Sequence, residues 1–201
     1  MIDRFPSAIQ RARTLARPAT ASSESLLAPA RIAGRLVEIS EAGSFGALSA
    51  VVGVLRDVQV RGEAVAWMAG ASVFFPPDLA FRGVDVQALC VVRVPGEPDL
   101  RAADWLLRSG AFGLVVIDGF EDQGNDAVLG RLAKLADEKQ TTVVFLTRKR
   151  TTDPSLGTLV SLRLGLVPLT GGTVELKVLK DKRAGSPVTQ RMTFHGPFGL
   201  Y

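Results

Sequence analysis

Cysteine and histidine are nearly absent from this chain: Cys90 is the single cysteine and His195 the single histidine. One cysteine cannot form an internal disulfide, and no cysteine and histidine cluster has the spacing of zinc ligands. His195 has no cysteine or carboxylate partner at a useful spacing, which argues against a catalytic triad or a metal site. These absences fit a reducing compartment and favour a packing role for His195.

Long apolar runs are also missing. No stretch of about 18 apolar residues runs without a charge, and the first 20 residues lack the apolar centre of a secretory signal. We therefore expect a cytoplasmic protein that makes no contact with a membrane.

The chain does contain enough apolar material for one core. Of its 201 residues, 47% are hydrophobic, which favours one domain with room for a short appendage. Its 24 Lys and Arg residues exceed its 20 Asp and Glu residues, for a formal charge of +4. That excess permits contact with nucleic acid or an acidic protein and establishes neither.

Two regions differ in composition. Residues 1–33 carry scattered arginines and an Ala/Ser/Pro-rich stretch, so we interpret them as a basic, partly ordered arm. Ile9, Leu15 and Ala16 could instead line a short helix that docks on a partner or a neighbouring subunit. Residues 34–201 form the expected core domain.

Apolar runs alternate with helix-length segments through most of the core, which indicates crossover units and a parallel sheet. Asp99 is the expected N-cap of one helix and Gly110 its end. Expected strands cover residues 35–39, 64–70, 89–94, 112–120 and 141–150, and expected helices cover 46–62, 98–110 and 126–140.

The last third of the chain has little helix-length material. Residues 159–169, 173–183 and 189–201 are expected to form shorter strands joined by glycine-bearing turns. The predicted fold class is therefore α/β, with a mostly parallel twisted sheet that ends in antiparallel strands.

Residues 34–55 have the strand, glycine-bearing turn and helix of a phosphate-binding P-loop. A working P-loop needs a Lys for the phosphates and a Ser or Thr hydroxyl for magnesium. Counted from Gly46, those two positions are Ala47 and Leu48. A methyl group and an apolar side chain cannot neutralise a triphosphate or hold a metal.

The turn itself could still attract an anion. Gly43, Ser44, Phe45 and Gly46 can present backbone N–H groups at a helix N-terminus. The charge of Glu41 and the bulk of Phe45 count against a nucleotide. We read these residues as a degenerate cofactor loop and expect neither a cofactor nor a metal.

One acid follows an apolar strand directly. Residues 114–117 are apolar and lead into Asp118, at the strand end that faces ligands in open α/β sheets. Trp67 and Trp105 lie on an expected core strand and helix, so we expect both to be core residues.

The order of these segments resembles the core of the bacterial recombinase RecA, a P-loop NTPase-type fold, over residues 34–201. The resemblance rests on GRLVEI, GVDVQAL, LVVIDGF and VELKVLKDKRAGSP in collinear order. It implies that Asp118 is a remnant of the Walker B acid. It also places the catalytic glutamate at Ala71 and the γ-phosphate-sensing glutamine at Arg148, so we expect no ATP hydrolysis and no catalytic residues.

Recombinases of this kind carry two DNA-binding loops in their core. Here the segment after Asp118 is short, and so is the segment between Arg150 and the next strand. Too little chain remains for the second mobile loop, so we do not expect DNA binding in the recombinase manner.

A RecA-like core with a degenerate loop is similar to the ImuA family of bacterial SOS mutagenesis cassettes. The resemblance implies a scaffold in damage-induced translesion synthesis. Its partners would be ImuB, a catalytically inactive Y-family polymerase relative, together with RecA and an error-prone replicative-type polymerase. The same family is often described as similar to SulA, which inhibits cell division by binding FtsZ.

Two basic groups are candidate contacts. They can meet DNA or an acidic partner surface, or they can be ordinary solvated charge. The resemblance places Lys180 and Lys182 where recombinase filaments reach a neighbour's nucleotide. The first group is expected at a strand end outside the core, and the members of the two groups are Arg148, Lys149, Arg150, Lys180, Lys182 and Arg183.

RecA-type subunits join by adding an arm of one subunit to the core of the next. We hypothesise that ImuB supplies such an arm here, received by the strand at residues 141–147 or by the helix at 126–140. The leading functional hypothesis is a non-enzymatic adaptor. The alternatives are a SulA-like inhibitor of FtsZ and a divergent, DNA-binding RecA-type ATPase.

Overall fold

The computed structural model describes residues 25–42, 46–70, 76–93, 96, 99–121, 126–170, 173–184 and 188–193. Within these residues, no helix is both long enough and apolar enough to cross a membrane. The expected helix around Ile9 and the expected role of His195 fall outside this part of the chain.

The described strands form one eight-stranded sheet in the order β3-β2-β4-β5-β1-β6-β7-β8. β6 pairs in parallel with β1 and antiparallel with β7, so it joins the parallel part to the antiparallel end. The predicted fold class is confirmed. The strands are β1 (Leu36–Ser40), β2 (Ala64–Ala69), β3 (Leu89–Arg93), β4 (Phe112–Asp118), β5 (Thr142–Thr147), β6 (Leu162–Pro168), β7 (Thr173–Asp181) and β8 (Thr189–Thr193).

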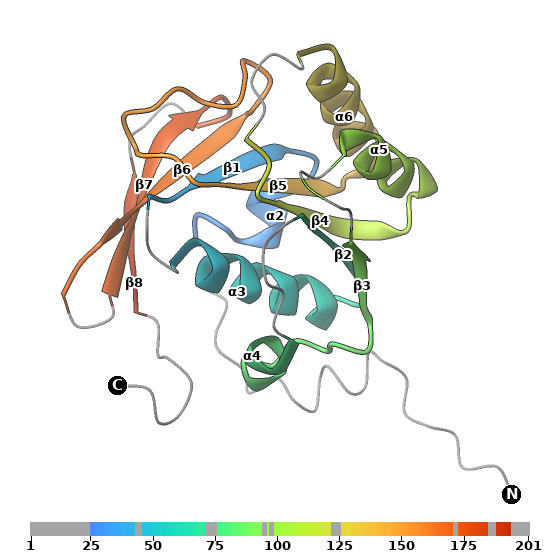
Figure 1. Ribbon diagram of the computed structural model, residues 1–201, viewed down its shortest axis with the longest axis horizontal. Helices are drawn as coiled ribbons and strands as arrows, with labels where there is room; N and C mark the ends of the chain where they lie inside the picture. Colours follow the sequence, from blue (N-terminus) through green and yellow to red (C-terminus); the bar gives the residue numbers. More distant parts are fainter. Residues whose placement is uncertain are drawn as a thin grey trace, which may run out of the picture.

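Helices cover both faces of the sheet (Figure 1). One face packs against α2 and α3 through a cluster that includes Val37, Trp67 and Val144. The other packs against α5 and α6 through a cluster that includes Met68, Ile117 and Phe145. The helices are α2 (Pro29–Ile32), α3 (Gly46–Val60), α4 (Pro76–Phe81), α5 (Leu100–Ser109) and α6 (Asp126–Lys139), of which α2 and α4 were not predicted.

The ends of α5 follow its sequence. The Asp99 side chain accepts a hydrogen bond from the Arg101 N–H (2.8 Å), and Gly110 closes the helix with a left-handed φ of 65°. That backbone N–H also holds the pKa of the exposed Asp99 carboxyl below its usual range. Both predicted ends of this helix are confirmed.

The core begins earlier than the predicted boundary at residue 34. Leu26 and Ile32 are buried among the residues that cover the α3 face. The Thr142 hydroxyl donates to the Ile32 carbonyl oxygen (2.9 Å), which attaches this segment to β5. Residues 25–33 are therefore part of the packed domain, because their apolar side chains complete one layer of the core.

Trp105 was expected in the core and is 74% exposed, whereas Trp67 is buried as predicted. The buried positions of α5 include Leu100, Ala103 and Leu107. Helical spacing places Trp105 on the opposite side of the helix from these three. The expectation for Trp105 is wrong for that reason.

A buried ion pair joins Arg35, the residue before β1, to Asp181 at the end of β7. Arg35 contacts the Asp181 carboxylate at 2.6 Å, and both side chains are almost fully buried. Burial by itself would raise the pKa of Asp181. Hydrogen bonds from Arg35 and from the backbone N–H groups of Arg183 and Ala184, with the charge of Arg35, outweigh burial and lower this pKa.

Candidate functional site

The candidate site lies at the carboxyl edge of the parallel strands, where ligands bind in open α/β sheets. β1 ends there at Ser40, β5 at Thr147 and β4 at Asp118. The register pairs Ser40 with Thr147 and Asp118 with Leu146, so the three strand ends are level. Asp118 lies on the ligand side, as predicted.

Glu41 follows β1 and binds the start of α3. Its backbone N–H continues the pairing with β5 by donating to the Thr147 carbonyl oxygen (3.0 Å). Its carboxylate accepts two backbone N–H groups: Oε1 from Gly46 at 3.0 Å and Oε2 from Ala47 at 2.7 Å. The side chain is buried.

This contact places a negative charge where the helix attracts anions. The first backbone N–H groups of a helix lack partners within the helix, and the helix dipole adds positive potential there. The Glu41 carboxylate supplies both the acceptor that these N–H groups lack and a negative charge that the helix dipole attracts. A phosphate entering this position would meet a carboxylate that already holds two of the donors.

Packing explains the glycine at position 46. A Cβ atom there would lie 2.9 Å from Leu166 Cδ2 and 3.1 Å from Val174 Cγ1, both on strands that pack against the helix start. The absence of a side chain therefore lets α3 approach β6 and β7 closely. This supports a structural reason for the glycine that is independent of any phosphate.

The two positions that hold the Lys and the hydroxyl residue in a working P-loop carry no side chain that could bind a phosphate or a metal. Ala47 is buried and Leu48 is partly exposed, and neither side chain can neutralise or coordinate an anion. Gly43, Ser44 and Phe45 lie outside the described residues. Of the predicted loop, the structure therefore describes Gly46, Ala47 and Leu48.

Asp118 is half-buried at the end of β4. β5 separates β4 from β1, so a strand lies between Asp118 and the Glu41 contact. Among the residues that the structure describes, no group of three or more His, Cys, Asp or Glu side chains is placed to hold a metal ion. Ala71 is outside those residues, and Arg148 follows β5 as an exposed side chain.

Lys149 corrects the expectation that the first basic group stays out of the core. Its side chain is 9% exposed, and its Nζ lies 3.9 Å from Oε1 of Glu38, which is fully buried. The neighbours Arg148 and Arg150 are exposed. Alternation along the chain turns Lys149 inward, where a buried carboxylate compensates its charge.

The second basic group is also partly used inside the molecule. Lys180 Nζ donates to the carbonyl oxygens of Gly157 (3.3 Å) and Thr158 (3.1 Å). Burial, followed by the charge of Lys182, lowers the pKa of Lys180. Arg183 donates to the Ala33 carbonyl oxygen (3.2 Å), and Lys182 is exposed.

The two basic groups lie at opposite ends of the sheet. Arg148 follows the carboxyl end of β5, at the ligand edge. Asp181, between Lys180 and Lys182, pairs with Leu162 at the amino end of β6, because β7 runs antiparallel. Arg148 and Lys182 therefore do not meet at one end of the sheet.

Glu38 is the residue that the sequence analysis missed. It is fully buried in β1 and contacts Lys149 and Arg163 (3.7 Å). The sequence does indicate a buried ion pair here, because an acid inside the apolar run LVEIS needs a buried partner. The sequence could not tell which basic residue would supply the charge.

β5 cannot receive an arm from a partner. It pairs with β4 on one side and with β1 on the other, so its backbone is already hydrogen-bonded. The strand expected at residues 141–147 as a receiving surface is therefore corrected. Within the described sheet, the strands with an open side are β3 and β8.

No protein-family model matches the chain. It is 36% identical to the RecA protein of Fusobacterium nucleatum over 86 residues, which is 42% of this chain and 23% of that protein. It is 30% identical to the RecA protein of Clavibacter michiganensis over 138 residues, 58% of this chain and 38% of that protein. It is 29% identical to the RecA protein of Lactobacillus acidophilus over 115 residues, which is 52% of this chain and 32% of that protein.

The matched stretches therefore span between about a quarter and two fifths of the length of these curated relatives. The similarity to RecA proteins agrees with the mostly parallel sheet and its antiparallel end. The sheet and the sequence similarity together support a RecA-like α/β fold.

Proposed function

We propose that the chain is a non-catalytic RecA-like adaptor of the ImuA type. In this proposal it binds an ImuB-like polymerase homologue and supports error-prone translesion synthesis after DNA damage. RecA and an error-prone replicative-type polymerase are the further partners that the resemblance implies. The observation that carries the non-catalytic part is the Glu41 carboxylate bound at the start of α3.

The chemistry behind this is electrostatic. A nucleotide phosphate needs free backbone donors and a cation at the loop. Here two donors hold Glu41, and the position of the cation is the buried methyl group of Ala47. Without a phosphate site, the function that this proposal leaves to the fold is the binding of other proteins on its surface.

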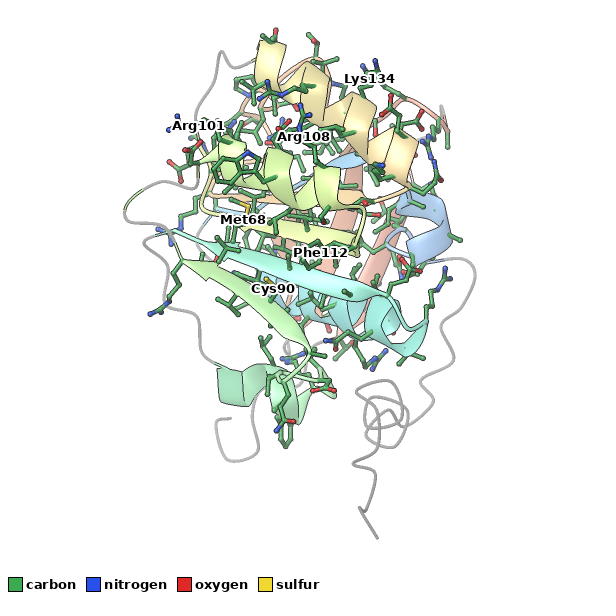
Figure 2. All side chains as sticks on the ribbon, turned by 90° about the vertical axis from the view of Figure 1, so that its right-hand side faces the viewer. Met68, Cys90, Arg101, Arg108, Phe112 and Lys134 are labelled. Carbon is green, nitrogen blue, oxygen red and sulfur yellow. The ribbon has the colours of Figure 1, made fainter. Side chains whose placement is uncertain are left out.

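The best binding surface for a partner strand is the open side of β3. Among the described strands it pairs only with β2, and Figure 2 shows it at the near edge of the sheet, between α5 above and α4 below. Val91 is partly exposed on the α4 side, and Val92 packs partly against the cluster beneath α5. An apolar edge strand with unpaired backbone groups is suited to β-strand addition.

The helices α4 and α5 also carry exposed aromatic side chains. Phe81 ends α4 and is 59% exposed, and Trp105 lies on the outer side of α5. Arg101 and Arg108 are exposed on the same helix as Trp105, and tryptophan and arginine are enriched in protein interfaces. We propose that an extended arm of the ImuB-like partner pairs with β3 and packs an apolar side chain beside it.

The test uses the full chain and a C-terminal fragment of an ImuB-like homologue. Val91→Glu places a charge on β3 and should weaken binding by at least about tenfold, since an unpaired buried charge opposes docking. Val188→Glu is the matched control, because Val188 has nearly the same exposure (40% against 38%) and precedes β8 at the opposite edge. Absence of binding by the wild type, or equal loss in both variants, would contradict the proposed interface.

Similarity to RecA proteins favours one competing function, a divergent ATPase that acts on DNA. It predicts nucleotide-dependent assembly on single-stranded DNA. Suppression of FtsZ assembly by a chain that does not bind the ImuB fragment would instead support the SulA-like alternative.

A further inference from the structure

The segment between β5 and β6, residues 148–161, crosses the sheet without forming a helix or strand. It leaves the carboxyl end of β5 and returns to the amino end of β6, so it runs over one face of the sheet. We call this segment the strap. Its backbone carbonyl and N–H groups lack the regular hydrogen bonds of a helix or sheet. They need other partners, because such groups are costly when they are buried and unpaired.

Three basic side chains supply those partners, of which Arg163 and Lys180 lie on neighbouring strands and Lys149 belongs to the strap itself. Arg163 donates to the carbonyl oxygens of Asp153 and, at 3.2 Å, Arg150. Lys149 donates to the carbonyl oxygen of Pro154 (3.5 Å).

Lys180 completes this set at the far end of the strap through the carbonyl oxygens of Gly157 and Thr158. Three cations therefore bind five carbonyl groups along the strap.

Glu38 binds the middle of the strap from below. Its Oε2 accepts the Ser155 hydroxyl at 2.6 Å and the Leu156 N–H at 3.0 Å. The same carboxylate faces Lys149 and Arg163, so it compensates the two cations while it holds the strap. It is the shared acidic partner of these groups.

Apolar packing closes the strap from the other side. Leu156 and Val160 are buried in the cluster that also contains Leu129 of α6. A Cβ atom on Gly157 would lie 2.9 Å from Asp126 Oδ1 and 3.1 Å from Leu129 Cδ1, so the strap lies close against the start of α6.

We infer that the strap is a latched unit that stays closed without any ligand and opens as a whole when the Glu38 charge is lost. Opening would uncover Leu156, Val160 and the apolar face of the sheet beneath them. In many switch proteins a bound phosphate orders such a segment. Here the ordering charges belong to the protein itself, and this inference does not depend on the proposed partner.

Hydrogen exchange of the full chain tests the latch. In the wild type, the Leu156 amide should exchange at least about tenfold more slowly than an unprotected amide, because it is bound to a buried carboxylate. Glu38→Gln should speed exchange of the strap amides by about tenfold or more. Ser155→Ala removes the hydroxyl that donates to Glu38 Oε2 (2.6 Å) and more weakly to the Gly157 carbonyl oxygen (3.4 Å), and it should speed this exchange about fivefold.

Arg148→Ala is the control, because this exposed neighbour of Lys149 should leave strap exchange unchanged. The amides of β4 report global unfolding and should stay within about twofold in Ser155→Ala. If Glu38→Gln unfolds the chain, Ser155→Ala decides the matter. Fast exchange of the wild-type strap, or unchanged strap exchange in Ser155→Ala, would overturn the inference.

Discussion

Glu38 and Glu41 show how two acids of the same segment acquire different tasks. Glu38 points into the sheet face that carries the strap, and Glu41 lies just beyond the end of β1, at the helix start. Both are buried, yet one is compensated by basic side chains and the other by backbone N–H groups. Their different partners follow from their position relative to the strand end.

Glu41→Ala should lower the free energy of unfolding by about 1–2 kcal/mol, since the N–H groups of Gly46 and Ala47 lose their acceptor. Urea denaturation measures this change. Glu138→Ala is the control, because Glu138 is exposed on α6 and forms only a surface pair with Lys134 (3.8 Å), so its effect should stay within about 0.5 kcal/mol. Equal effects of the two substitutions would show that the hydrogen bonds of Glu41 add no more to the free energy of unfolding than an exposed surface pair does.

Asp181 should make stability depend on pH in the acidic range. Because its pKa is lowered in the folded state, its stabilisation is present above the ordinary aspartate value of about 4 and is lost as pH falls through the folded value. Asp181→Asn should cost about 3 kcal/mol at neutral pH, because Arg35 would remain buried without its counter-ion.

The measurement is the difference in unfolding free energy between wild type and Asp181→Asn at pH 6 and at pH 3. The difference should be smaller at pH 3, because below the ordinary aspartate pKa the unfolded wild type takes up a proton at Asp181 and the wild type loses part of this stabilisation. A difference that is the same at both pH values would contradict the assigned role of this ion pair.

At the scale of elements, α5 offers a paired test of backbone conformation. Gly110→Ala should destabilise the protein by about 1 kcal/mol, because Gly110 has a φ of 65° that L residues rarely adopt. Space is not the cause, since the nearest atom to a Cβ there is Lys139 Cδ at 3.7 Å. Gly53→Ala in α3 has open space and ordinary helical φ, so it should stabilise by up to about 1 kcal/mol.

Thermal or urea unfolding of the two glycine variants gives opposite signs if this account is correct. Destabilisation by both substitutions would mean that the backbone conformation of Gly110 is not what fixes the end of α5.

Regular elements were predictable because their signals are local. Asp99 and Gly110 mark the ends of α5, and the apolar run before Asp118 marks β4. The strap was not predictable, since its partners, Glu38 and Lys180, are far from it in sequence. α4 also escaped, because a helix of six residues carries too little periodicity.

For the candidate site, the sequence predicts which chemical groups are present or missing, but it does not predict how they are arranged. The losses at Ala47 and Leu48 can be read directly from the sequence, and Glu41 was noted as a charge beside the loop. That its carboxylate would bind the first N–H groups of α3 depends on the geometry of the strand end. Trp105 was misplaced because a tryptophan on a helix was assigned to the core without its position relative to Leu100, Ala103 and Leu107.

At the scale of the whole molecule, the order of the described strands decides which of them have an open side. β5 and β1 lie in the interior of the sheet, and β3 and β8 are its edges. The basic side chains are divided between opposite ends of the sheet, and Lys149 and Lys180 are used to hold the strap. Binding of a protein partner at the β3 edge stays a proposal, which the Val91→Glu and Val188→Glu pair tests.

We propose that the carboxyl edge of this RecA-like domain has no nucleotide function. The most direct measurement is ATP hydrolysis by the purified chain, with magnesium and with or without single-stranded DNA. The account predicts a rate equal to the protein-free background in both conditions and no change when Asp118 is replaced by alanine. Hydrolysis above background that Asp118→Ala abolishes would contradict it.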